Sequence, residues 1–147
     1  MNALELLKQD HEEVKELFEQ AEGTEESKEQ RNIFNQIKKA LEAHARIEEG
    51  IFYPAMEKHE QLRDLVLESY EEHKQIKILL KEMDDLVTGS EKFEPKLRVL
   101  QEIVEHHAEE EEEEIMFPQV RELLDDAALE QLGRKLEVAK GNRSKAA

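Results

Sequence analysis

Residues 44–54 read HARIEEGIFYP, and residues 106–118 read HHAEEEEEEIMFP. Both stretches place a glutamate about one helical turn after a histidine, and both end on an aromatic residue followed by a proline. A histidine and a glutamate four residues apart lie on the same face of an α-helix. Two interpretations are open: a charged helix surface that repeats by chance, or two helices that direct ligands at one metal site.

The composition limits what this chain of 147 residues can be. It has no cysteine, which excludes disulfides, zinc–thiolate sites and iron–sulfur clusters. A formal net charge of −16 argues against nucleic acid, whose phosphates require a basic surface, and against anionic membranes. No apolar run approaches the ~20 residues that a membrane span needs. We therefore expect a single cytoplasmic domain, and a monomer because its outer faces are strongly charged.

Apolar residues recur three and four positions apart through most of the chain, and almost no segment alternates as a β-strand would. The predicted helices are residues 3–22, a second one through Ile51 with Pro54 near its end, residues 60–87, a fourth from Pro95 through Ile115, and a short one after Pro118. Helices of this length with short polar loops favour an all-α, up-down-up-down four-helix bundle. We expect the bundle over residues 1–122, then a short C-terminal helix and a frayed tail over residues 123–147.

The two halves of the chain resemble each other. DHEEVKELF (10–18) parallels EHKQIKILL (72–80), which places His11 opposite His73. The two stretches that run from histidine through glutamate to proline form a second matching pair. The fold is therefore predicted to consist of two similar helical hairpins about a pseudo-twofold axis, and a site on that axis would draw matching ligands from each half.

Each of the four long helices points one histidine of its apolar stripe inward: His11, His44, His73 and His107. In the second helix Glu48 continues the stripe, and in the fourth Glu111 does. Burying carboxylates and imidazoles without partners is costly, so we expect a pair of cations among them. Imidazole and carboxylate ligands without thiolate suit iron, manganese or zinc, and a paired site with two bridging glutamates favours iron.

Other polar residues carry a weaker prediction. His59 follows Pro54 and is expected at the surface, and His106 is expected at the surface or behind the ligands. The glutamates of residues 109–114 are expected to form a solvated face with one ligand at most. An alternative is a metal-free helical interaction module, in which the inward histidines are ordinary core residues.

These motifs resemble the hemerythrin-like family, also called the HHE cation-binding domain. The resemblance spans roughly residues 4–121 and rests on His11 in QDHEEV, His44 and Glu48 in HARIEEGIFYP, His73 in EEHKQI, and His107 in HHAEEEEEEIMFP. It implies a non-haem di-iron centre with an oxo or hydroxo bridge, in which Glu48 and the late glutamate also bridge the two irons.

One position departs from the oxygen-carrying members of that family. They have a further histidine one turn after the one matched by His73, and here Lys77 stands there. A protonated lysine cannot be a ligand. One iron is therefore expected to have an open position, a water or a substitute such as Tyr70, which weakens a role in reversible oxygen carriage.

The late glutamate is ambiguous. His107 is one residue further from Pro118 than His44 is from Pro54. The extra residue predicts a π-bulge in the fourth helix, a feature often found at functional sites. Helical phase favours Glu111 as the ligand, whereas counting back from the proline favours Glu112.

We expect, then, a di-iron protein that binds, senses or reacts with O₂, NO or peroxide, or that stores iron, in iron handling or in oxidative and nitrosative stress. Weak peroxide disproportionation or NO reduction is compatible with an open iron position, although no catalytic residue is assigned. The alternatives are a repair protein that donates iron or reduces NO, and the metal-free interaction module.

Overall fold

The structure is a computed structural model that describes residues 1–146, and all regular structure in that range is helical. The elements in chain order are α1 (Ala3–Glu22), α2 (Ser27–Ile47), the π-helical segment η1 (Glu48–Phe52), α3 (Tyr53–Glu57), α4 (Glu60–Asp84), α5 (Phe93–Glu105), the π-helical segment η2 (His106–Met116), α6 (Phe117–Leu123) and α7 (Asp126–Ala146). α2, η1 and α3 follow one another without a break, as do α5, η2 and α6. The chain therefore forms four long helices and a C-terminal one.

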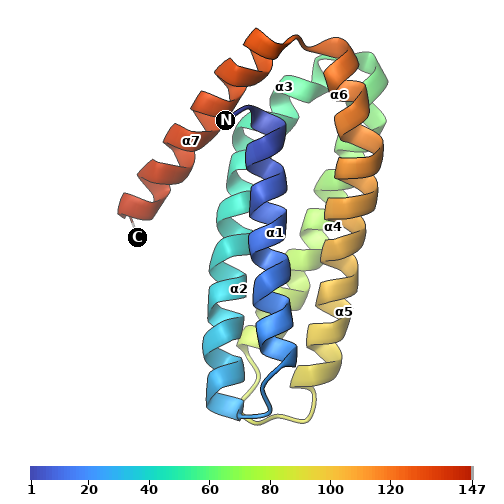
Figure 1. Cartoon of the computed structure of the whole chain (residues 1–147). Helices are drawn as coiled ribbons and strands as arrows, with labels where there is room; N and C mark the ends of the chain where they lie inside the picture. The colour runs from blue at the N-terminus through green and yellow to red at the C-terminus, as the bar shows by residue number, and fades with distance from the viewer. Residues whose placement is uncertain (147) are drawn as a thin grey trace.

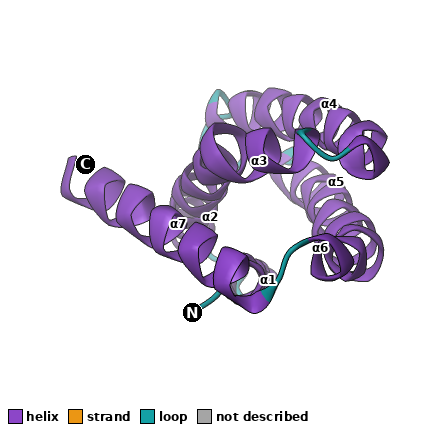
Figure 2. Cartoon of the chain, turned by 90° about the horizontal axis from the view of Figure 1, so that it is seen from above, coloured by secondary structure: helices purple, strands orange, loops and turns teal. Residues whose placement is uncertain are grey.

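The four long helices run alternately up and down and pack side by side (Figure 1), and the view along the bundle shows them around one interior (Figure 2). α7 leaves the top of the bundle and slopes along the outside of α1 and α2 (Figure 1). The predicted all-α bundle with a C-terminal helix is confirmed. α7 continues through residues 141–146, where we expected a frayed tail, and residue 147 lies outside the described residues. Among residues 1–146, no helix has the length and apolar character of a membrane span.

Polar side chains define where individual helices begin. The side chain of Asn2 accepts a hydrogen bond of 2.9 Å from the backbone N–H of Glu5 at the start of α1. Asp125 does the same for the N–H of Ala128, at 2.8 Å, at the start of α7. Such caps satisfy backbone donors that have no partner inside the helix.

Both π-helical segments end where a proline follows. Proline has no N–H, so the regular i→i−4 hydrogen bond cannot form at that position. One residue earlier, the N–H of Tyr53 donates to the carbonyl of Glu48, and the N–H of Phe117 donates to that of Glu112, five residues back in each case. The π-bulge predicted for the fourth helix is confirmed. The second helix contains one as well, which the sequence analysis did not predict.

The buried apolar side chains form two clusters at opposite ends of the bundle. The upper cluster includes Leu7, Phe52 and Phe117. The lower cluster includes Phe18 and Phe34. Between the two lies a layer of buried polar side chains: Asp10, His44, Glu48, His73, His107 and Glu112. The clusters hold this layer on both sides, so the helices that supply it cannot shift without breaking apolar packing.

α7 meets the N-terminus at Gly133, and this contact gives a stability prediction. A Cβ at Gly133 would lie 2.3 Å from the carbonyl oxygen of Met1 and 2.9 Å from the backbone nitrogen of Ala3. We expect Gly133→Ala to lower the free energy of unfolding by up to about 2 kcal/mol, because overpacking costs ~1–3 kcal/mol and the helix propensity of alanine returns about 1. Denaturant unfolding measures the difference.

The matched control is Gly141→Ala in the same helix, where a Cβ would meet nothing within 4 Å. We expect this substitution to be neutral or stabilising. Equal stabilities of the two variants would contradict the close approach of α7 to the N-terminus.

Candidate metal centre

Six side chains meet in the polar layer: His11 from α1, His44 from α2, Glu48 from η1, His73 from α4, and His107 and Glu112 from η2. Their exposed fractions are at most 9 %, and those of Glu48 and Glu112 are 0 %. The four histidines thus face one interior point from four helices, as their apolar stripes predicted. We call these six residues the buried centre.

The buried centre divides into two groups of potential ligand atoms, each within 4.8 Å of one another. The first group is His11, His44, Glu48 and Glu112, and the second group is Glu48, His73 and His107. Glu48 belongs to both, since its Oε1 lies 3.2 Å from Nε2 of His44 and 3.1 Å from Nε2 of His73.

Glu112 spans the same two groups from the opposite hairpin. Its Oε1 lies 3.1 Å from Nε2 of His11, and its Oε2 lies 3.3 Å from Nε2 of His107. In the second group, Nε2 of His73 and Nε2 of His107 are 3.0 Å apart. Two carboxylates that each reach both groups are arranged as bridging ligands of a two-metal site would be.

Each histidine of the buried centre holds a carboxylate at its other ring nitrogen, Nδ1. The pairs are His44 with Asp10 (2.8 Å), His11 with Glu113 (2.7 Å), His73 with Glu49 (2.8 Å) and His107 with Glu72 (2.6 Å). A carboxylate accepts from N–H, so Nδ1 carries the hydrogen and the lone pair of Nε2 points into the centre. Metal-ligating histidines are typically oriented in this way.

These four carboxylates were not predicted from the sequence, although the sequence carries a signal for them. Each one is the immediate neighbour of a residue of the buried centre, as in Asp10–His11 and Glu48–Glu49. It serves a histidine on a different helix, however. A pairing between helices is not visible from spacing along one helix.

Several atoms of the buried centre have no hydrogen-bond partner: Nε2 of His11, Nε2 of His44, both carboxylate oxygens of Glu48, and Oε1 of Glu112. Leaving a buried polar atom unsatisfied costs about 1–3 kcal/mol. Here lone pairs of nitrogen face lone pairs of oxygen, which repel unless a positive charge lies between them. The donor set, imidazole nitrogen with carboxylate oxygen, fits iron, manganese or zinc.

Protons compete with metal ions for these nitrogens. Burial lowers the pKa of His44, but the charge of Glu48 and the hydrogen bond with Asp10 outweigh it and raise the pKa to about 10. Burial also lowers the pKa of His107, but the charge of Glu112 outweighs this effect, so the pKa lies well above its ordinary value. Burial raises the pKa of Glu48, but the charge of His44 outweighs it and holds the pKa well below the ordinary value.

Tyr53 contributes a hydroxyl to the second group, and the sequence analysis did not single it out. Its oxygen lies 3.3 Å from Nε2 of His73 and 3.2 Å from Nε2 of His107, and it donates to Oε2 of Glu112. Tyr70, which we had suggested for this side, instead packs its ring edge-on against that of Tyr53 at 5.4 Å.

Tyr53 could have been found in the sequence by aligning the two halves of the chain on Pro54 and Pro118. The residue before the proline is tyrosine in the first half and Phe117 in the second. Phe117 stacks on the ring of His11, with centroids 6.3 Å apart. The two groups therefore differ: one has a hydroxyl against its histidines, and the other has an apolar ring.

The π-helical turn places Glu112 in the buried centre and Glu111 outside it, whereas helical phase had favoured Glu111. Glu112 is fully buried between the two groups. Glu111 lies on the outer side of η2, where its Oε1 is 3.2 Å from Nε2 of His106. An α-helix would have turned Glu111 inward, but the wider turn delays the inward position by one residue.

Lys77 and His59 lie away from the ligand atoms. The side chain of Lys77 is 55 % exposed, and its Nζ pairs with Glu49 at 3.2 Å, so it adds no ligand. His59 precedes α4 and is half-buried outside the centre. The half-exposed His106 lies outside the buried centre, with its Nε2 3.2 Å from Oε1 of Glu111.

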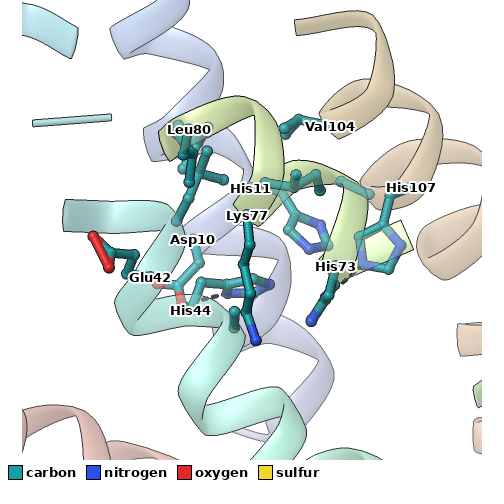
Figure 3. A pocket seen from close by; sticks show the side chains of 14 residues that line it. Asp10, His11, Glu42, His44, His73, Lys77, Leu80, Val104 and His107 are labelled. Carbon is teal, nitrogen blue, oxygen red and sulfur yellow. Dashed lines mark hydrogen bonds and ion pairs between the residues drawn. The ribbon is translucent and has the colours of Figure 1, made fainter. Parts of the chain in front are cut away.

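A small cavity adjoins the buried centre (Figure 3). Its volume is about 50 Å³, and its walls are the four inward histidines and apolar residues of the lower cluster that include Val14, Ile76, Leu80 and Val104. The lining also reaches the exposed Lys77. The volume has room for a few water-sized molecules and for nothing much larger.

Comparisons with known proteins identify the class of protein that this fold and centre define. A family model described as the Hemerythrin HHE cation binding domain matches residues 2–120, and the chain belongs to this family. A crystal structure described as a Hemerythrin HHE cation binding domain-containing protein, an Rv2633c homolog from Mycobacterium kansasii, is 30 % identical with a TM-score of 0.81. The match covers 97 % of this chain and 89 % of that one.

Two further relatives are similar over nearly the whole chain. The Uncharacterized protein Rv2633c of Mycobacterium tuberculosis is 28 % identical over 92 % of this chain and 83 % of its own length. A DNA nickase of Nostoc sp. is 29 % identical over 95 % of this chain. The chain spans only 39 % of the length of that nickase.

The position of Glu112 predicts a clear difference between neighbouring substitutions. We expect Glu112→Gln to weaken metal binding by more than about 100-fold, since even a lost outer partner of a ligand costs about 10–100-fold. Glu111→Gln should leave the metal content of the buried centre unchanged, because its side chain points away from that centre. Metal analysis of both purified variants tests this, and loss of that metal in the Glu111 variant would contradict the assignment.

The raised pKa of His44 predicts a dependence of stability on pH. A group with a raised pKa stabilises the fold fully below its unfolded value, here 6.5, and loses that contribution as the pH rises through the folded value of about 10. We expect the chelator-treated chain to become less stable over this interval, by up to about 1.4 kcal/mol per pH unit for one proton. The affinity of the buried centre for a metal ion should rise over the same interval, because binding releases the proton.

Denaturant unfolding at pH 6.5, 8 and 9.5 measures the stability of the chelator-treated chain. His44→Gln is the control, since it removes this titrating imidazole and should make the loss of stability with pH less steep, while His107 still titrates. Equally steep profiles for the wild type and the variant would refute the proton assigned to His44.

Proposed function

We propose that the buried centre binds two iron ions and that the protein reacts with peroxide there. The observation that carries this proposal is the convergence of four Nε2 lone pairs on two fully buried carboxylates. In the proposed arrangement, His11 and His44 would hold one ion, His73 and His107 would hold the other, and Glu48 and Glu112 would contribute carboxylates to both. The iron pair would supply redox chemistry toward peroxide, oxygen or nitric oxide.

The outer carboxylates of the chain keep the imidazoles in the required tautomer. Asp10, Glu49, Glu72 and Glu113 each hold an Nδ1–H, and so each Nε2 stays available. Asp10 is itself paired with Lys140 of α7. The orientation of the centre is thus supported from outside the four-helix bundle as well as from within it.

The cavity limits what can reach the buried centre. About 50 Å³ between apolar walls admits hydrogen peroxide, O₂ or NO and excludes larger or strongly charged substrates. The same volume argues against a store of many iron ions. A net charge of −16 argues against DNA as a substrate, even though one longer relative is named a nickase.

Tyr53 favours peroxide among these small molecules. Burial, and then the charges of Glu112 and Glu48, raise its pKa well above the ordinary value, so the hydroxyl keeps its proton. Conversion of peroxide requires protons to be held and passed between oxygen atoms. A protonated hydroxyl 3.2–3.3 Å from two ligand nitrogens is placed to hold one.

The proposal is tested on protein purified from iron-supplemented cells. We expect about two irons per chain and measurable consumption of added peroxide. Tyr53→Phe should keep the iron and slow peroxide consumption about 3–10-fold, the equivalent of one hydrogen bond. Tyr70→Phe is the matched control, because it removes a hydroxyl from the neighbouring ring outside the buried centre.

Two results would overturn the proposal. A chain that binds no iron and takes up none on addition would make the inward histidines ordinary core residues. A chain with two irons that does not consume peroxide, but binds O₂ or NO, would retain the iron centre and replace the reaction.

A further inference from the structure

A second set of ligand-type side chains lies outside the buried centre. His106 and Glu111 of η2 and Glu72 of α4 bring one potential ligand atom each to within 4.8 Å of one another. We call these three residues the outer cluster. The side chains of Glu72 and Glu111 are 16 % and 14 % exposed, and that of His106 is 50 % exposed, so an ion can reach the cluster from solvent.

His106 is oriented in the same way as the buried histidines. Its Nδ1 lies 2.9 Å from a carboxylate oxygen of Glu110, which accepts the ring N–H. Its Nε2 then faces Oε1 of Glu111 at 3.2 Å and Oε2 of Glu72 at 3.7 Å. A lone pair of nitrogen and two carboxylates thus converge on one point, with a carboxylate behind the imidazole, as is typical of a metal-ligating histidine.

The pseudo-twofold axis gives an independent reason to expect a cation there. Glu72 corresponds to Asp10 in the first half of the chain. Each gives one oxygen to the Nδ1–H of a buried histidine. The other oxygen of Asp10 is paired with the ammonium group of Lys140, whereas the other oxygen of Glu72 faces His106 and Glu111. The outer carboxylate oxygen thus meets a positive charge in the first half of the chain, whereas the equivalent oxygen in the second half meets further potential ligand atoms.

The local charge also favours a cation. Glu68 and Glu72 act on Glu111 as neighbouring negative charges, and Glu110 lies behind the imidazole of His106. We propose that the outer cluster is a third metal site, which binds a divalent transition ion such as Mn²⁺, Fe²⁺ or Zn²⁺. One imidazole and two carboxylates are the ligands that such ions accept. The site uses residues that the proposed iron pair does not bind directly, and so it does not depend on that proposal.

The ion would share a carboxylate with the buried centre. Glu72 holds the Nδ1–H of His107 with Oε1, at 2.6 Å, and offers Oε2 to the outer cluster. The outer site is therefore one side chain away from the buried ligands. An ion collected from solvent would be held beside the centre that the proposal above fills with iron.

The test is a titration of the purified, iron-loaded protein with Mn²⁺ at pH 7.5, in which free Mn²⁺ is followed by electron paramagnetic resonance. We expect one additional Mn²⁺ per chain. His106→Gln should weaken its binding at least about 10-fold, because a ligand is lost. His59→Gln is the matched control, since it removes another half-buried histidine that lies outside both sites. Glu111→Gln should also lose the Mn²⁺ and keep both irons.

Two outcomes would overturn the inference: no uptake of Mn²⁺ by the wild-type chain, or equal uptake by the His106 and His59 variants. Either outcome would mean that protonated His106, rather than a metal ion, supplies the positive charge among these carboxylates. Iron per chain is measured in the same samples. Wild-type protein that binds two irons but no Mn²⁺ would overturn only the outer site. Wild-type protein that binds no iron, but takes up one Mn²⁺ that the His106→Gln variant does not bind, would overturn only the iron pair.

Discussion

Two carboxyl groups, those of Glu48 and Glu112, lie fully buried in the middle of the bundle, and the rest of the structure is arranged around them. Burying a carboxylate without compensation is costly. The chain surrounds the pair with imidazoles and fixes each imidazole with an outer carboxylate. Each buried histidine therefore lies between an outer carboxylate and one of the two inner carboxylates. Nitrogen and oxygen atoms of both side-chain types are thus directed at one region, and this convergence favours a cation there.

The backbone is adapted to the same requirement. A proline stands six residues after each buried carboxylate, and the π-helical turn between them sets the carboxylate's direction. Apolar clusters above and below hold the helices in register. Because the two hairpins repeat this device, the centre has approximate twofold symmetry, which suits a pair of like ions. The symmetry is broken because Tyr53 lies against the second group and Phe117 against the first, and so the two groups of potential ligands are chemically distinct.

The outer layer of the centre differs between the halves in a related way. Asp10 is neutralised from outside by Lys140 of α7, so the C-terminal helix takes part in orienting the first group. Glu72 meets a histidine and a further glutamate instead. In the first half, the outer carboxylate is thus paired with a lysine of the chain. In the second half, the equivalent carboxylate belongs to the outer cluster, which we propose binds an ion from solvent. Both solutions place positive charge beyond the carboxylate that orients a buried histidine.

The bundle, the duplicated hairpins and the inward direction of the four histidines were predictable from the sequence, because helical periodicity is a local property that each segment displays alone. The extra residue before Pro118 was visible there too. That Glu112 rather than Glu111 faces the centre was not predictable, since the location of the π-helical turn depends on packing. The same holds for the entry of Tyr53 rather than Tyr70 into the second group, and for which carboxylate holds which histidine. Those contacts join different helices, and spacing along one helix carries no information about its neighbours.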